Sequence, residues 1–484
     1  MSRKRKVITS YSEPATVDRI GECPDSLLVH ILSLLPIEDA VRTQVLSKRW
    51  QLLWTFLPSL LFRSPLRYPV FNDDDSDDED FRVASSDEFT AFVDKTLMFS
   101  NSKVEKFEVG FEYEPRFASS VDSWTWFAAG KGVEELHLQL WPDVFDLHED
   151  ERYELPQILY GNSKFRELLF SCCRVIPKGN VAWYSLKKLS IGYVNLSSDV
   201  IEKILAGSPV LEMLELHHCE GFRRLSVTNS CVKKLILRDF LCNGDEFGSG
   251  LEISAPYLLS LEMSGGLGRS CRFMNVSSLV DAVFNCQFVC AEQDRANDTE
   301  RIQDMVRGLL ASLVHVKNLM LGAWAIEVLS IMEAKGLSCP LLECECLTVH
   351  TQINKHVLLG IASILKSTPN LERLAMTLSL FLLEHFEIEL AELCRYNEEQ
   401  YWTAQKWTYN CLTLHLKNVK IAGSWWCRDS NFLAFIQLLL RNARVLQKMV
   451  ITNPNDYRLE DYFQAAQELL SFPRSSPDAV VIFC

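Results

Sequence analysis

Two stretches of the chain carry the same spacing of apolar residues, ILAGSPVLEMLEL at residues 204–216 and ILKSTPNLERLAM at residues 364–376. Counted from zero, apolar side chains stand at positions 0, 1, 7, 10 and 12 of both stretches. The leading apolar pair is typical of the end of a helix, and the Ser-Pro or Thr-Pro step that follows is typical of a turn. The alternating apolar residues after it indicate a strand. The pattern therefore predicts a repeating helix–turn–strand unit.

Copies of this unit recur along the chain. The full pattern also begins at Leu97, Trp126, Ile158, Leu309 and Leu439. Its strand half alone recurs at Leu186, Val232, Leu258 and Cys411. One such unit cannot bury its apolar edge, whereas stacked units can, so we predict an irregular α/β solenoid whose strands line one wall. Some units are expected to have lost their helix, because the spacing between copies is uneven.

A different pattern stands before the repeats, in CPDSLLVHILSLLPIEDAVRTQVLSKRWQLLW at residues 23–54. Pro24 suits the start of a helix and Pro36 its end, because proline is tolerated in the first turn but not in the interior. A second helix is predicted over residues 38–46, and a third from Ser47 through Trp54. Such a short helical segment is near the lower limit of independent stability. Its surplus apolar surface predicts either a standing partner or packing on the rest of the chain.

The segments that flank these helices are highly charged. Residues 1–17 form a basic tail with RKRK at residues 3–6, which resembles a short nuclear-import signal, so we expect residence in the nucleus, the cytoplasm or both. Residues 65–90 contain FNDDDSDDEDF, and a block of like charges predicts a disordered acidic linker that separates the helices from the repeats. Ser76 in this run is either a phosphorylation site or part of a solubilising loop.

Composition excludes several functional classes. The net charge of −14 argues against a nucleic-acid ligand, which requires a basic face. No stretch reaches the roughly 18 apolar residues of a membrane helix. The N-terminus lacks the apolar core of a signal peptide, so we expect an intracellular protein whose 16 cysteines are mostly reduced and buried.

A search for catalytic and metal-binding motifs finds one candidate. Cys339, Cys344, Cys346 and His350 have the residue types of a zinc site, and strand alternation would place the last three on one face. The paired C-x-x-C spacing is absent, so scattered buried thiols are the simpler interpretation. The glycine-rich residues 264–270 lack the Lys of a phosphate-binding loop and indicate a turn. We therefore expect no metal, cofactor or catalytic residue.

Residues 18–64 resemble an F-box of the form common in plant proteins, on the phrases PD-LL--ILS-LP, VLSKRW and LW. The resemblance implies docking to a Skp-type adaptor, which links F-box proteins to a cullin scaffold. The residues that match the contact positions of the family are Leu27, Leu28, Ile31, Leu32, Leu35, Pro36, Val45, Leu46, Arg49 and Trp50. Of these, we expect Leu35, Pro36 and Trp50 to form the centre of the contact.

The remaining chain resembles the degenerate leucine-rich repeats (LRRs) that follow plant F-boxes, here over residues 91–404, although the regular asparagine of tidier repeats is missing. Residues 405–484 resemble the α+β FBD module of such proteins on HLK, LLLRNARVLQKMVI and LLSFPRSSP, and are expected to cap the solenoid. These resemblances imply a non-catalytic substrate-recognition subunit of a Skp–cullin–F-box ubiquitin ligase. The alternative is an LRR scaffold without a degradation substrate.

The target-binding surface should be the strand wall, because the leucines of L-x-x-L-x-L point inward and the residues between them face out. We expect an unknown protein target there, and the small number of cations argues against inositol phosphates or nucleic acid. The outward positions are His137, Gln139, Ser190, Glu215, His217, Arg238, Glu262, Thr348, His350, Arg373, Thr377, Thr413 and His415. Ordinary strand-surface residues would form the same pattern, because residue type alone does not identify a binding face.

Overall fold

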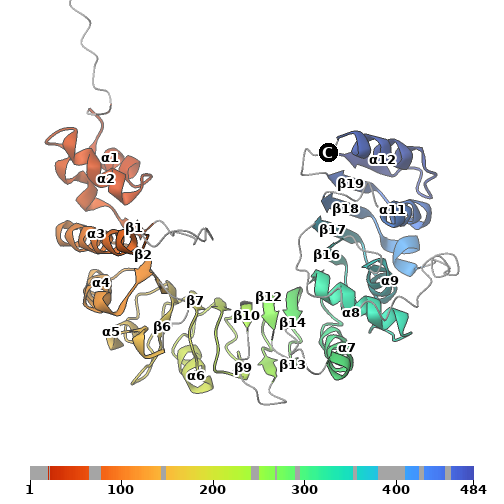
Figure 1. Cartoon of the computed structure of the whole chain (residues 1–484), viewed down its shortest axis with the longest axis horizontal. Helices are drawn as coiled ribbons and strands as arrows, with labels where there is room; N and C mark the ends of the chain where they lie inside the picture. Colours follow the sequence, from red (N-terminus) through yellow and green to blue (C-terminus); the bar gives the residue numbers. More distant parts are fainter. Residues whose placement is uncertain are drawn as a thin grey trace, which may run out of the picture. The chain divides into compact units, whose positions relative to one another are not determined.

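The computed structural model (Figure 1) describes residues 20, 22–64, 78–142, 149–240, 250–267, 270–288, 295–352, 357–379, 409–423, 430–452 and 459–484. The basic tail, Ser76 and residues 65–77 and 380–408 lie outside the described residues. The chain divides into two compact units. The first comprises Met1–Glu112 and Arg116–His137, and the second Tyr113–Pro115 and Leu138–Cys484.

The first unit begins with the predicted short helices. They are α1 (Asp25–Leu32), α2 (Ile37–Arg42) and the 3-10 helices η1 (Thr43–Val45) and η2 (Trp50–Phe56). Pro24 and Pro36 occupy the N-cap positions of α1 and α2, with φ values of −58° and −52°. Because the proline ring holds φ near this value, each proline sets the direction in which its helix starts.

The rest of the first unit pairs a helix with each strand. Its elements are β1 (Ser59–Arg63), α3 (Asp78–Phe99), β2 (Lys106–Tyr113), α4 (Ala118–Lys131) and the first residues of β3 (Glu135–Pro142), with η3 (Pro115–Phe117) before α4. β1 and β2 are parallel, with Leu60 opposite Phe107 and Phe62 opposite Val109. Phe62 is fully buried and packs edge-on against Phe107, with ring centroids 6.1 Å apart.

Two expectations about the linker were wrong. Residues 78–90, predicted to be disordered, form the first half of α3. The F-box segment is also not an uncoupled module, because its last residues form β1 and Glu105 donates its backbone N–H to the carbonyl of Pro58 at 2.7 Å. The helix forms because Phe89 stacks on Phe111 and Phe92 packs against Phe62, so tertiary contacts outweigh the charge of its N-terminal end.

The second unit is built on one series of parallel strands, in the order β5-β7-β8-β10-β12-β14-β15-β16-β17-β18-β19-β20. Their bounds are β5 (Glu167–Ser171), β7 (Lys188–Gly192), β8 (Met213–His217), β10 (Lys234–Phe240), β12 (Ser260–Leu267), β14 (Asp281–Phe288), β15 (Asn318–Leu321), β16 (Cys346–Gln352), β17 (Arg373–Ser379), β18 (Asn418–Gly423), β19 (Lys448–Thr452) and β20 (Val480–Phe483). Such a sheet is the architecture predicted for the repeats.

Helices connect most of these strands on one side of the sheet (Figure 1). They are α5 (Gln157–Tyr160), α6 (Ser198–Ala206), α7 (Arg295–Ser312), α8 (Ala323–Ala334), α9 (Val357–Ser367), α11 (Ser430–Asn442) and α12 (Leu459–Ser471), with η4 (Glu149–Glu151). In the middle units, short strands stand in the place of the helix. These strands are β9 (Arg224–Ser226), β11 (Leu251–Ser254) and β13 (Cys271–Asn275). A separate pair of short strands is formed by β4 (Tyr153–Glu154) and β6 (Cys173–Arg174). All seven predicted full copies are therefore confirmed as helix followed by strand.

Matching positions of the repeat form the core of the second unit. Leu189 lies opposite Leu214, which lies opposite Leu235, which lies opposite Leu261. Each of these side chains is buried. Because side chains alternate along a strand, the positions on either side of this row point to the opposite face. No helix among the described residues is both long and apolar enough to span a bilayer.

One predicted strand was wrong. Cys411–His415 is a π-helix, closed by the hydrogen bond from the N–H of Leu416 to the carbonyl of Cys411 at 2.8 Å. Strand alternation would place Leu412, Leu414 and Leu416 on the same side. In the π turn Leu412 and Leu416 are buried whereas Leu414 is 61% exposed. The strand of this unit is β18, which begins only at Asn418.

Candidate functional site

Helix α1 has two apolar sides. Leu28 and Leu32 are completely buried, whereas Leu27 and Ile31 are exposed. Residues four apart lie on the same face of a helix, so each pair forms one stripe. One stripe packs into the core of the N-terminal helices, and the other faces solvent.

Further large apolar side chains are exposed on the neighbouring helices and the turns between them. The large apolar side chains exposed within residues 25–56 are Leu27, Ile31, Leu34, Leu35, Val45, Leu46, Leu52 and Phe56, and we call them the N-terminal apolar surface. Val45 is 83% exposed and Leu34 is 74% exposed. Single exposed apolar residues are ordinary, whereas a large exposed apolar patch marks an interaction site. The N-terminal helices therefore offer a surface suited to a protein partner.

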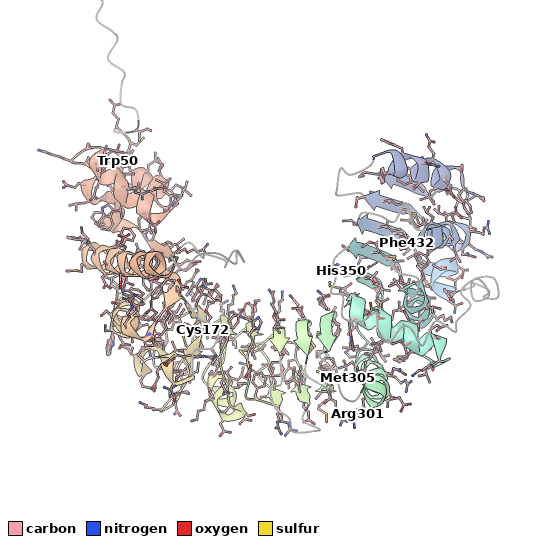
Figure 2. All side chains as sticks on the ribbon, in the orientation of Figure 1. Trp50, Cys172, Arg301, Met305, His350 and Phe432 are labelled. Carbon is pink, nitrogen blue, oxygen red and sulfur yellow. The ribbon has the colours of Figure 1, made fainter. Side chains whose placement is uncertain are left out.

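The sequence predicted part of this surface. Five of its residues were expected contacts, and Pro36 is also exposed. Leu28, Leu32 and Trp50 were wrong as surface contacts, because the two leucines are fully buried and Trp50 is only 8% exposed. Figure 2 labels Trp50 on the N-terminal helices. All three belong to the chain's own core, since an amphipathic short helix must first bury one stripe to fold.

Arg49 joins two of the helices. Its Nε and Nη2 donate to Oδ1 of Asp25 at 2.9 and 2.6 Å, and Nη2 also donates to the carbonyl of Cys23. The arginine thus ties the start of η2 to the start of α1. Leu34, Leu52 and Phe56 were missed by the sequence analysis, although the i, i+4 spacing of Leu52 and Phe56 was a visible signal.

The strand wall consists of the outward side chains of the parallel strands. Of the predicted wall residues, those that lie on strands and are half-buried or exposed are Gln139, Glu215, His217, Arg238, Glu262, Thr348, His350, Arg373 and Thr377. Thr413 and His415 were wrong as strand positions, because they lie in the π-helix. Ser190 is buried, since its small side chain lies between the larger Leu169 and Glu215 on the neighbouring strands.

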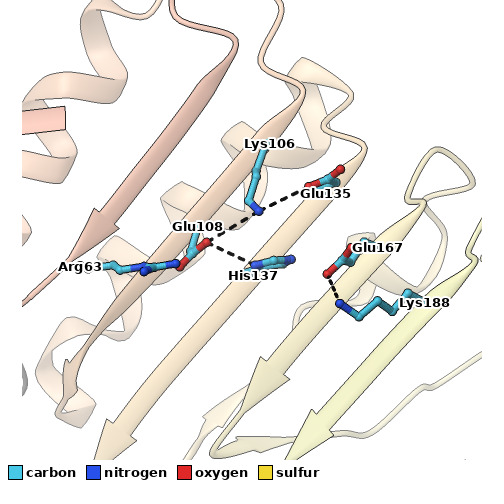
Figure 3. A network of polar contacts seen from close by, with 7 residues as sticks. All are labelled: Arg63, Lys106, Glu108, Glu135, His137, Glu167 and Lys188. Carbon is cyan, nitrogen blue, oxygen red and sulfur yellow. Dashed lines mark hydrogen bonds and ion pairs between the residues drawn. The ribbon is translucent and has the colours of Figure 1, made fainter. Parts of the chain in front are cut away.

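His137 is also buried, and the reason is a polar network in the first unit (Figure 3). Its Nδ1 lies 3.3 Å from Oε2 of Glu108, whose other oxygen accepts from Nε of Arg63 at 2.5 Å. The hydrogen bond with His137 and the contact with Arg63 outweigh burial and lower the pKa of Glu108 to about 2. This network holds adjacent strands together and is not a free binding surface.

Charged residues of the wall in the second unit are mostly paired. Nη2 of Arg238 lies 3.1 Å from Oε1 of Glu262, and its Nε lies 3.7 Å from Oε1 of Glu215. Lys188 forms an ion pair of 2.8 Å with Glu167 (Figure 3). Neutralised pairs of this kind contribute little net charge to the surface.

An aromatic cluster stands where the strands β7, β8 and β10 end. Tyr193 stacks on His218 with ring centroids 4.3 Å apart, and His218 Nε2 lies 3.3 Å from Oδ2 of Asp239. Cys172, Tyr193, His218 and Asp239 all have positive φ values, between 49° and 58°. Such backbone conformations are costly for residues other than glycine and cluster at functional sites. The repeat pattern gave no signal for them, because they follow the strand motif.

The cysteines do not form the zinc site that was considered. Cys344 is buried, whereas Sγ of Cys346 accepts from Nε of Arg373 at 2.8 Å, and no cluster of three metal-ligating side chains exists in the described part of the chain. Burial raises the pKa of Cys344 to about 12 and that of Cys339 to about 11. These thiols are protonated near neutral pH, which makes them poor nucleophiles.

Comparison with known proteins agrees with this geometry. A family model of the At1g61320/AtMIF1 LRR domain matches residues 99–469, and a model of the F-box domain matches residues 20–61. The chain belongs to the plant F-box/LRR-repeat family. The F-box/LRR-repeat protein At5g02910 of Arabidopsis thaliana is 29% identical over 464 residues, which cover 94% of this chain and 92% of the relative. The F-box/LRR-repeat protein At3g03360 of the same plant is 30% identical over 368 residues, 74% of this chain and 70% of the relative.

The family assignment places both candidate surfaces in matched domains. The F-box model includes every residue of the N-terminal apolar surface. The LRR model ends at residue 469 and so includes most of the segment that resembles an FBD module. In this F-box/LRR protein β18, β19 and β20 continue the parallel series, so the C-terminal segment continues the repeat sheet. A separate FBD module remains a prediction.

Proposed function

We propose that this F-box/LRR protein is a substrate-recognition subunit of a Skp–cullin–F-box ubiquitin ligase. The N-terminal apolar surface docks a Skp-type adaptor, which connects the chain to a cullin, and the strand wall binds the protein to be ubiquitinated. In this arrangement the chain is a non-catalytic subunit. The basic run at residues 3–6 leads us to propose entry into the nucleus as well as residence in the cytoplasm.

The exposure of the N-terminal apolar surface carries this proposal. The F-box helices already bury Leu28, Leu32 and Trp50 in their own core, so their fold does not account for the apolar side chains that remain in solvent. Burial of one large aliphatic side chain contributes roughly 1.5–3 kcal/mol. A partner that covers several of them gains enough to offset the entropic cost of association.

The experiment is co-purification of the full chain with a Skp-type adaptor. Val45→Asp combined with Leu46→Asp places two charges on the N-terminal apolar surface without disturbing the core, because both side chains are exposed. We expect this variant to lose at least about tenfold in adaptor affinity. Met274→Asp combined with Phe463→Asp is the matched control, since these apolar residues are comparably exposed outside the F-box.

The control should bind the adaptor like the unmodified chain. Adaptor binding by the Val45→Asp, Leu46→Asp variant at unchanged affinity would show that the N-terminal apolar surface is not the docking site. An equal loss in both variants would show a general effect of added charge.

A further inference from the structure

An open depression of about 470 Å³ lies on the strand wall over β15 to β19. Three cationic side chains line it, those of Arg373, Lys420 and Lys448. Ala375 and Val450 contribute small apolar groups to its surface. From the sequence, few cations were expected on the wall, and neither lysine was among them.

The strand register brings the three cations together. Arg373 lies opposite Asn418, and Asn418 lies opposite Lys448, so the arginine and this lysine are two strand spacings apart, about 10 Å. Lys420 is two residues beyond Asn418 on the intervening strand and therefore points to the same face, about 7 Å further along. The cations form a triangle on one face of three adjacent strands.

These cations lack ion-pair partners among the described residues, although the charge of Arg373 acts on nearby Glu372, whose pKa is lowered mainly by its hydrogen bond with Lys417. No carboxylate forms an ion pair with any of the three within the described part of the chain, and the one hydrogen bond of the Arg373 side chain goes to Cys346. In the row beside them, Lys417 pairs with Glu372 at 2.6 Å and Lys317 with Glu345 at 3.3 Å. A protein of net charge −14 thus carries a local excess of positive charge at this place. Unpaired cations in a depression attract anionic groups.

The shape of the depression suits an extended peptide. Strands are spaced about 4.8 Å apart, so a path across β15 to β19 is about 19 Å long, the length of about six extended residues. Thr348 and Asn418 line this path and can hydrogen-bond a peptide backbone, whereas Nδ2 of Asn318 already donates to Oδ1 of Asp281 at 2.6 Å. Every second side chain of such a peptide faces the wall, where carboxylates would meet the three cations.

We propose that this depression binds an extended, carboxylate-rich segment of the target protein. The inference rests on the proposed function, because it assigns a chemical class to the target that the strand wall recognises. It also assigns the recognition to residues of which only Arg373 and Thr348 were expected from the sequence.

Fluorescence anisotropy of a labelled peptide with the full chain tests this inference. The probe is a fluorescein-labelled hexapeptide of alternating Asp and Ala, and its control has Asn in place of each Asp. We expect the Asp peptide to bind at least about tenfold more tightly than the Asn peptide. Raising NaCl from about 50 mM to about 300 mM should weaken the Asp peptide most, because salt screens exposed charges.

Two double variants locate the binding. Lys420→Gln with Lys448→Gln should weaken the Asp peptide about tenfold. Lys164→Gln with Lys203→Gln makes the same change of net charge at exposed lysines outside the depression and should leave binding unchanged. Equal binding of the two peptides, an equal loss in the two double variants, or no binding of the Asp peptide would each overturn the proposal.

Adaptor co-purification with the same preparations separates this inference from the proposed function. Loss of peptide binding with full adaptor binding in the Lys420→Gln, Lys448→Gln variant supports a target site distinct from the docking surface. If the unmodified chain binds the Asp peptide but not the adaptor, the ligase function is overturned and the peptide site stands.

Discussion

Trp50 shows how burial separates folding residues from docking residues. Its side chain is 8% exposed, whereas that of Val45 is 83% exposed. Trp50→Ala should therefore lower the free energy of unfolding by about 3–5 kcal/mol, because it leaves a cavity in a packed core. Val45→Ala should change it by less than about 0.5 kcal/mol. Denaturant unfolding of the full chain measures both. If Trp50→Ala left the unfolding transition unchanged but abolished adaptor binding, Trp50 would be a residue of the adaptor interface and not of the core.

Glu108 should make the stability of the first unit depend on pH in acid. Its pKa is lowered from 4.5 to about 2 in the folded protein, so the ionised carboxylate stabilises the fold above pH 4.5 and that contribution is lost as the pH falls towards 2. We expect roughly 2 kcal/mol, less than the full shift implies, because its partner Arg63 is largely exposed.

The comparison with Glu108→Gln isolates this carboxylate from the others that titrate in acid. The free energy of unfolding of the variant should fall less between pH 4.5 and 2 than that of the unmodified chain. Parallel pH profiles for the two proteins would show that the network with His137 and Arg63 contributes nothing measurable.

At the scale of elements, helices α8 and α9 pack closely at Gly360. A Cβ at this position would lie 2.1 Å from the carbonyl oxygen of Ile326, and the N–H of Gly360 donates to Oγ of Ser330 at 3.0 Å. Gly360→Ala should therefore force the helices apart and destabilise the second unit by about 1–3 kcal/mol. Gly308→Ala in α7 is the matched control, because its Cβ would meet no atom within 4 Å.

Thermal unfolding should show a lower midpoint for Gly360→Ala and an equal or higher midpoint for Gly308→Ala. Equal midpoints would argue against close helix packing at Gly360.

The sequence predicted the elements whose apolar period is complete. Each copy with both an apolar pair and a Leu-x-Leu half became a helix and a strand, because both halves must be buried. The copies that showed only the strand half did not predict the other half of the repeat unit, in which β9, β11 and β13 take the place of helices. The sequence did not reveal the π turn at Cys411–His415, because its alternating leucines are compatible both with a strand and with a turn that exposes Leu414.

The sites were predictable to a smaller extent. Periodicity identified the apolar stripes of α1 but not which stripe faces solvent, because that choice depends on η2 and the segments packed against it. Lys420 and Lys448 were missed because their significance lies in having no ion pair with any carboxylate that the structure describes, and this depends on the register of neighbouring strands.

At the scale of the whole molecule, the F-box segment folds as part of a larger unit. β1 pairs with β2, and Leu60 and Phe62 are buried. A fragment that ends at residue 64 exposes these side chains and should be less stable and less soluble than a fragment of residues 1–137. Circular dichroism during thermal unfolding of both fragments measures this difference. Equal midpoints and solubility would indicate an F-box that folds independently.

The central claim is that the chain recruits a protein for degradation. Affinity purification of the full chain from plant cells, followed by mass spectrometry with and without proteasome inhibition, tests it directly. The Val45→Asp, Leu46→Asp variant serves as the control that binds targets but not the adaptor. We predict at least one partner that accumulates on the unmodified chain only under inhibition and is retained by the variant without it. A set of partners that is the same with and without inhibition, and the same for both proteins, would contradict the claim and indicate a scaffold.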